Sequence, residues 1–152
     1  MKIGIIFYSK TGHTNQACES IAERFRKNGH IVELSEVTVV DVKTNKTLKD
    51  IPSMEGYDVL LLGTPVQGFS LPLPMVDYLK QSKMTKNQKL GVVITQYFKV
   101  SWLGANHTMK QLLSGCAYAN PDLYGYSVIH WSSKRRVEQL SKATDKLTNL
   151  DV

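Results

Sequence analysis

Short apolar runs alternate with amphipathic helical segments along almost the whole chain, and this alternation constrains the fold more than any other feature. The clearest run, 59–64, reads V-L-L-L-G-T and is typical of a parallel strand buried on both faces. The expected strands are 3–7, 30–35, 59–64, 89–95 and 123–130. Strands alternating with helices predict an α/β fold, a three-layer, doubly wound, five-stranded parallel sheet with helices on both faces.

Apolar residues spaced three and four apart predict the helices. Cys18, Ile21 and Phe25 share one face of a helix over 14–27. Further helices are expected over 74–82, up to about 114, and from 133 onward. The region 36–54 begins with several valines and ends with several lysines, and we expect an extension of the second strand and a short helix there. The whole chain would then contain about five strands and five helices.

Length and composition narrow the classes of protein. The 152 residues predict one domain, and neither a membrane-spanning run nor a signal-peptide pattern is evident, so we expect a cytoplasmic protein. A net charge of +6 allows anionic partners, but no basic recognition helix or aromatic-studded basic sheet indicates nucleic-acid binding. Cys18 and Cys116 lack the spacing of a zinc or dithiol site and fall on apolar helix faces, which favours buried thiols.

The first strand leads into a polar loop, and the stretch 2–15 reads K-I-G-I-I-F-Y-S-K-T-G-H-T-N. Ser9, Thr11 and Thr14 offer hydroxyls, Gly12 allows a tight turn, and the following helix directs backbone N–H groups at one point. This chemistry suits a phosphate group. The loop is neither a Walker A motif nor a dinucleotide fingerprint, and the same residues would also serve simply to cap the helix.

This loop resembles the first FMN-phosphate loop of the flavodoxin family, S/T-x-T-G-x-T, with His13 where that family often has Asn. The segment G-T-P-V-Q-G-F after the third strand and T-Q-Y-F after the fourth resemble the second and third flavin loops. The resemblance covers essentially the whole chain. It implies a single FMN-binding domain over 1–152 with the strand order 2-1-3-4-5, in which these loops meet at the carboxyl edge of the sheet.

The resemblance assigns parts of FMN to particular residues. The phosphate is expected at Ser9, Lys10, Thr11, Gly12, His13 and Thr14. Ribityl and ring contacts are expected from Thr64, Pro65, Val66, Gln67, Gly68 and Phe69. The third loop contributes Thr95, Gln96, Tyr97, Phe98, Trp102 and Gly104, with Tyr97, Phe98 or Trp102 offering a ring face. Alternatively, Phe69 closes its loop over the core, Tyr97 and Phe98 end a buried strand, and Trp102 fixes its loop against the following helix.

The charge of this edge departs from the flavodoxin pattern. Electron-carrier flavodoxins surround the flavin with carboxylates, whereas here the second and third loops contain no Asp or Glu. Cations stand there instead: Lys10, Lys99, Lys134, Arg135 and Arg136. We hypothesise that they bind an anionic partner or stabilise a negatively charged reduced flavin, the alternative being a solvated basic surface.

Three functions follow as hypotheses. The first is an FMN-dependent electron carrier between partner proteins. The second is a small flavin oxidoreductase that uses NAD(P)H or a quinone, and the third is a module that binds a phosphate-bearing ligand without a redox role. No side chain is assigned as a catalytic acid or base, because the cofactor carries the chemistry in the first hypothesis.

Overall fold

One parallel sheet organises the molecule, and its strands lie in the order β2-β1-β5-β6-β7. The structure is a computed structural model that describes residues 1–41, 43, 47–98 and 104–150. The sheet strands are β1 (Lys2–Phe7), β2 (Ile31–Glu36), β5 (Val59–Pro65), β6 (Lys89–Gln96) and β7 (Asp122–His130). Counted along the chain, this is the flavodoxin-like order 2-1-3-4-5, which confirms the prediction.

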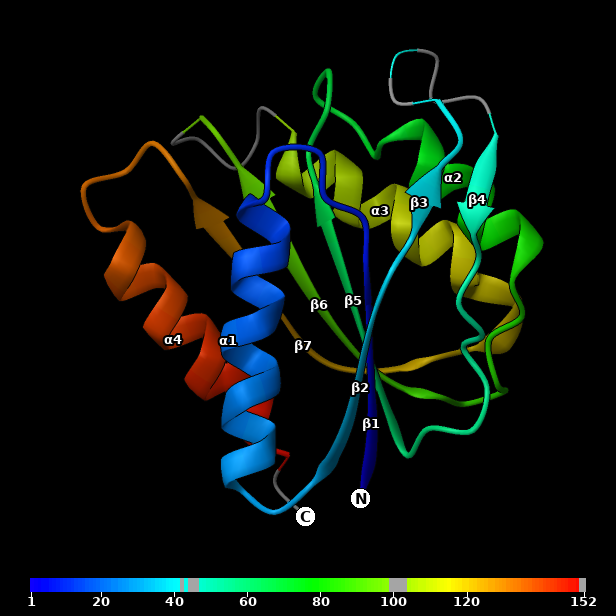
Figure 1. Cartoon of the computed structure of the whole chain (residues 1–152), viewed down its shortest axis with the longest axis horizontal. Coiled ribbons are helices and arrows are strands. Elements are labelled where there is room, and N and C mark those ends of the chain that lie inside the picture. Colours follow the sequence, from blue (N-terminus) through cyan, green and yellow to red (C-terminus); the bar gives the residue numbers. More distant parts are fainter. Residues whose placement is uncertain (42, 44–46, 99–103, 151–152) are drawn as a thin grey trace.

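Helices cover both faces of the sheet, as Figure 1 shows. The helices α1 (His13–Lys27) and α4 (Arg136–Thr148) lie on one face, and α2 (Leu73–Gln81) and α3 (Ala105–Cys116) lie on the other. A short 3-10 helix, η2 (Ala117–Ala119), follows α3. Successive side chains of β1 therefore enter different cores: Ile5 packs with α1, whereas Ile6 packs beneath α2 and α3.

The connection between β2 and β5 differs from the expectation. Instead of a short helix, the described residues of this region form two antiparallel strands, β3 (Thr38–Val39) and β4 (Leu48–Asp50). The β-branched residues at its start favour extended backbone, and Val37 is fully buried in the core beneath α2 and α3. Among the described residues there are thus four α-helices rather than five.

Helix α1 packs closely on the sheet because β5 has a glycine where they meet. A Cβ at Gly63 would lie 2.5 Å from Cys18 Sγ and 3.2 Å from Thr14 Cγ2. Cys18 and Cys116 are both buried free thiols, as predicted, and burial raises the pKa of Cys116 to about 11. No helix within the described part of the chain is long and apolar enough to cross a membrane.

Candidate functional site

The carboxyl ends of the sheet strands bring four loops to one edge of the molecule. In Figure 1 this edge lies at the top, where β1, β5 and β6 end, and the turn before α4 lies to the left. The sheet topology thus gathers segments that are far apart in sequence, at the position where open α/β sheets bind ligands.

The first loop is held in shape by its own hydrogen bonds. Ser9 Oγ accepts from the backbone N–H of Gly12 at 3.1 Å and of Asn15 at 3.4 Å. Gly12, the N-cap of α1, has φ 90°, a left-handed conformation that glycine adopts readily. This N-cap has no side-chain hydrogen bond among the described residues. Helix α1 begins at His13, and the first N–H groups of a helix have no carbonyl partner within the helix, so His13 and Thr14 bring to this loop the backbone donors that an anion site requires.

A buried hydroxyl pair connects the first and third loops. Thr14 Oγ1 and Thr95 Oγ1 lie 2.8 Å apart and share a hydrogen bond. The side chain of Thr14 is 1% exposed, so its hydroxyl points beneath the loop rather than toward solvent. Thr14 can thus offer a ligand its backbone N–H, while its side chain holds the two loops together.

The second loop is a tight turn in which Gln67 and Ser70 exchange backbone hydrogen bonds of 2.9 and 3.0 Å. The two central residues, Gly68 and Phe69, have φ values of 55° and 62°. Glycine tolerates this conformation, whereas an aromatic residue adopts it rarely and at a cost. The side chain of Phe69 is 53% exposed, so the alternative that it closes the loop over the core is wrong.

Aromatic rings of the second and third loops meet outside the sheet. Phe98 stacks on Phe69 with ring centres 5.9 Å apart, and its ring meets Tyr97 edge to face at 5.8 Å. Tyr97 and Phe98 are 66% and 50% exposed, because β6 already ends at Gln96. The alternative that they complete a buried strand is therefore wrong. Trp102 lies outside the described residues.

These loops surround one hollow of about 460 Å³, which we call the central hollow. It is lined by Lys10, Thr11, His13, Pro65, Val66, Gln67, Gly68, Thr95, Gln96 and Tyr97. Each of these residues was singled out from the sequence. The predicted residues that do not line it are Ser9, Gly12, Thr14, Thr64, Phe69, Phe98 and Gly104.

The predicted residues that lie away from the hollow have structural contacts. Thr64 is fully buried and its hydroxyl donates to the carbonyl of Pro65 at 3.0 Å. A Cβ at Gly104 would lie 2.6 Å from Cγ1 of Val66 and 3.2 Å from the backbone of Phe69. Gly104 therefore lets the start of α3 approach the second loop, which is a packing role.

The sequence analysis missed the contribution of Trp131, which directly follows β7. His13 stacks on Trp131 with ring centres 4.5 Å apart and an angle of 14° between the planes. Burial of the imidazole, and to a lesser extent the charge of Arg136, lowers the pKa of His13 below its ordinary value. The sequence could have indicated Trp131 by its position, because it follows the fifth parallel strand, which must end at the same edge of the sheet as the other four.

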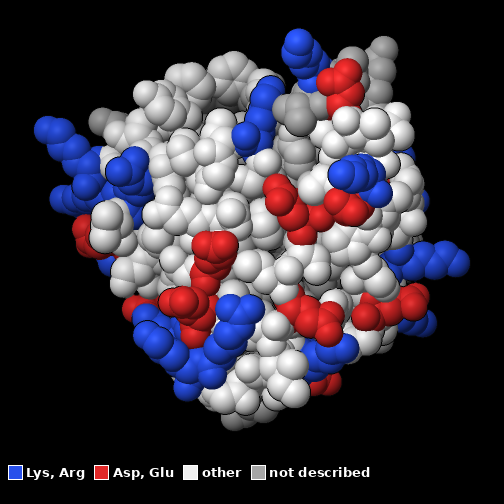
Figure 2. All heavy atoms as spheres, viewed as in Figure 1, with Lys and Arg blue, Asp and Glu red and all other residues white. Residues whose placement is uncertain are grey.

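Cations gather beside this site. Lys134, Arg135 and Arg136 are all exposed, and α4 begins at Arg136, three residues later than predicted. Figure 2 shows Lys and Arg atoms at the left side of this face, where Figure 1 has the turn before α4. Lys99, also predicted to lie at this edge, is outside the described residues.

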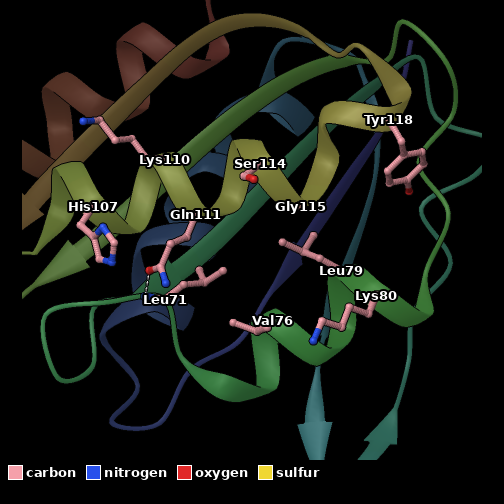
Figure 3. A pocket seen from close by; sticks show the side chains of 10 residues that line it. All are labelled: Leu71, Val76, Leu79, Lys80, His107, Lys110, Gln111, Ser114, Gly115 and Tyr118. Carbon is pink, nitrogen blue, oxygen red and sulfur yellow. Dashed lines mark hydrogen bonds between the residues drawn. The ribbon is translucent and has the colours of Figure 1, made fainter.

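A larger hollow lies elsewhere, between α2 and α3. This α2–α3 groove, of about 690 Å³, has Leu71, Val76 and Leu79 on its apolar side and His107 and Lys110 on α3 (Figure 3). It shares no lining residue with the central hollow and contains no phosphate-type loop. Its chemistry therefore does not match the features that the three loops present.

The site offers binding groups rather than nucleophiles. The described residues contain no cluster of three or more His, Cys, Asp or Glu residues suited to a metal ion. The buried thiols of Cys18 and Cys116 have raised pKa values and remain protonated. This edge of the sheet presents backbone N–H groups, hydroxyls and an exposed aromatic ring. The N–H groups and hydroxyls suit a phosphate, and the ring suits a planar group, so together they suit a phosphorylated, planar ligand.

Comparison with known proteins identifies the fold. No protein-family model matches the sequence, and no curated protein matches it. Oxidised flavodoxin 2 from Bacillus cereus has a TM-score of 0.68 at 18% identity, covering 98% of this chain and 99% of its own. The flavodoxin of Streptococcus pneumonia TIGR4 gives 0.63 at 20% identity, covering 97% of both chains. The flavodoxin, WrbA-like protein from Agrobacterium tumefaciens gives 0.64 at 12% identity, covering 98% and 96%. The chain therefore has the flavodoxin fold.

Proposed function

We propose that this chain is a single-domain, FMN-binding electron-transfer protein. The observation that carries the proposal is the central hollow, in which the loops after β1, β5 and β6 converge. These three loops are the ones whose sequences resemble the flavin loops of flavodoxins. The Bacillus cereus flavodoxin is described in an oxidised form, which agrees with a redox role for this fold.

The phosphate end of FMN fits the start of α1. Ser9 Oγ accepts two backbone N–H groups, which leaves its own proton free to be donated. Thr11 adds an exposed hydroxyl, and the first N–H groups of α1 add the positive end of the helix dipole. Lys10, which is exposed, places a cation at the same point. These donors suit a phosphate dianion, which offers acceptors only.

The flat ring of FMN fits the remainder of the hollow. Tyr97 offers an exposed aromatic face, while Pro65 and Val66 offer apolar surface. Gly68, without a side chain, lets the backbone of the second loop approach the ring. The volume of about 460 Å³ lies within the usual range for small-ligand sites, about 300–1,000 Å³. When bound, FMN supplies the electron transfer, and the protein positions the cofactor and tunes its potential.

The first experiment is a visible absorption spectrum of the purified protein, recorded before and after FMN is added and the excess removed. We expect flavin bands to remain with the protein. FMN should bind about 100-fold more tightly than riboflavin, because two charge-assisted hydrogen bonds to the phosphate contribute about 1.5 kcal/mol each. A protein that stays colourless would refute the FMN proposal and favour a module for another phosphate-bearing ligand.

The basic charge of the edge favours a second candidate, a flavin oxidoreductase that uses NAD(P)H or a quinone. Lys10, Lys134 and Arg136 would attract an anionic substrate, whereas the second loop has no carboxylate to repel one. Adding NADH or NADPH to the FMN-loaded protein without oxygen separates the candidates. Bleaching of the flavin bands by the nucleotide alone indicates the oxidoreductase, and persistent bands favour the carrier.

A further inference from the structure

A second hollow lies directly beside the central one. This basic hollow, of about 550 Å³, is lined by His13, Tyr97, Trp131, Ser132, Ser133, Lys134, Arg136 and Val137. His13 and Tyr97 line both hollows, so the two are neighbours separated by these side chains. Most of its lining comes from the turn before α4, whose cations the sequence analysis assigned to an anionic partner or a reduced flavin without naming a ligand.

Arg136, an exposed lining residue of the basic hollow, is held in place against Trp131. Its guanidinium carbon lies 5.4 Å from the centre of the Trp131 ring, and its Nη1 donates to the Trp131 carbonyl at 3.1 Å. A guanidinium has five N–H donors, and this backbone bond uses one. The remaining donors form a fixed fork that can bind a phosphate in a bidentate manner.

The other charges of the basic hollow are also positive. Lys134 is exposed and has no ion pair within the described part of the chain. The nearest acid in the sequence of α4, Glu138, is paired with Lys142 at 3.2 Å. The lining residues include no Asp or Glu. Because cations at the start of a helix oppose its dipole, this arrangement is unfavourable until an anion binds there.

The remaining lining indicates more than a free anion. Tyr97 and Val137 are 66% and 75% exposed, and they place an aromatic ring and an apolar side chain beside the cations. A ligand that combines phosphate with a planar base would use both kinds of surface. The hydroxyl of Ser133 accepts from Arg135 N–H at 3.1 Å and can still donate its own proton.

We propose that the basic hollow binds an adenosine phosphate, with Arg136 and Lys134 on the phosphate and Tyr97 and Val137 beside the base. This inference rests on the proposed function, since it places the nucleotide next to the flavin. Two ligands carry this group. One is FAD, whose adenylate half would extend from the central hollow past His13, and the other is a separate nucleotide such as NAD(P)H.

The test compares the dissociation constants of FMN, FAD and ADP by fluorescence and calorimetric titration, with ADP added to both the unloaded and the FMN-loaded protein. Lys134→Glu is the main variant, because its side chain is exposed and its loss should not affect folding. Arg136→Gln is the second variant. The control is Lys83→Glu, which makes the same charge change at an exposed position after α2, outside the lining of both hollows.

We expect one of two results: FAD binds about tenfold more tightly than FMN, or ADP binds the FMN-loaded protein. In Lys134→Glu and in Arg136→Gln, the preference for FAD or the affinity for ADP should fall about tenfold. The control should change neither quantity. FAD preference identifies the linked ligand, and ADP binding identifies the separate one. Equal FMN and FAD affinities without ADP binding overturn the inference while FMN binding stands. Effects that survive both variants overturn it as well.

The same titrations separate this inference from the proposed function. If FMN and FAD fail to bind but ADP binds and is lost in both variants, the FMN proposal is wrong and the nucleotide site stands. If none of the three ligands binds, both are wrong. A general loss of positive charge would weaken FMN and FAD equally, so the ratio of their affinities is the measured quantity.

Discussion

The hydroxyl pair between Thr14 and Thr95 gives the sharpest test of how the candidate site is built. In Thr14→Val, the hydroxyl of Thr95 loses its partner while 97% of that residue's surface remains covered. An unsatisfied buried hydroxyl costs about 1–3 kcal/mol, and Val matches the shape of Thr. We therefore expect a loss of about 1–2 kcal/mol in the free energy of unfolding, and a similar loss in Thr95→Val.

The double variant Thr14→Val/Thr95→Val should be more stable than either single variant and close to the wild type, because replacing both partners by apolar groups of the same shape is nearly neutral. The cycle, measured by urea denaturation, should give a coupling energy of about 1 kcal/mol or more. Thr108→Val is the matched control, since the Thr108 hydroxyl is buried without a hydrogen-bond partner among the described residues. It should be neutral or stabilising.

The same variants test which part of Thr14 meets the ligand. The structure directs its hydroxyl to Thr95 and leaves its N–H at the start of α1, so Thr14→Val should change the FMN affinity by less than about threefold. Additive losses in the cycle would show that the hydroxyls do not depend on each other. A tenfold loss for FMN with none for riboflavin would show that the Thr14 hydroxyl binds phosphate, contrary to this reasoning.

Three other changes test separate features. Thr11→Val should weaken FMN binding about tenfold and leave riboflavin unchanged, because an exposed phosphate donor is lost; equal losses in the two titrations would exclude that contact. Gly63→Ala should destabilise the fold by about 1–3 kcal/mol, measured by urea denaturation, because the added Cβ would lie 2.5 Å from Cys18 Sγ. Adding Cys18→Ala should relieve part of this cost. If the free-energy losses of the two single variants simply add in the double variant, the close packing is contradicted. The pKa of His13 is lowered from 6.5, so the unfolded chain binds a proton more readily than the folded one; the ligand-free protein should lose stability as the pH falls below about 6.5, and His13→Gln should remove that component of the denaturation profile.

The sheet and most of its helices could be predicted because both faces of the sheet are covered. A strand such as β5, buried at nearly every position, must be apolar throughout, and its sequence shows it. The region around Val37 gave no such signal. Its two strands, β3 and β4, are only two and three residues long and pair with each other. Strands this short cannot show a two-residue alternation of apolar side chains, and the region shows no helical period either.

The residues around the central hollow could be named from the sequence because parallel strands must end at a common edge. The directions of their side chains could not. Phe69 turns outward because its backbone adopts a positive φ within a tight turn, and Thr14 turns inward because Thr95, 81 positions later, offers a buried partner. Side-chain directions such as these depend on backbone geometry and on contacts between residues far apart in sequence. The spacing of residues within one loop does not indicate either.

The hydrogen bonds of this edge divide its residues into two groups with different roles. Thr95 bonds Thr14 through its hydroxyl and accepts Val66 N–H at 3.0 Å through its carbonyl, and Gln96 accepts Trp131 N–H at 2.7 Å. These bonds join the described parts of all four loops, and such preformed contacts reduce the ordering that must accompany ligand binding. The residues available to a ligand are then the exposed ones that line the hollows. Substitutions in the first group should therefore change stability more than affinity, and substitutions in the second should do the reverse.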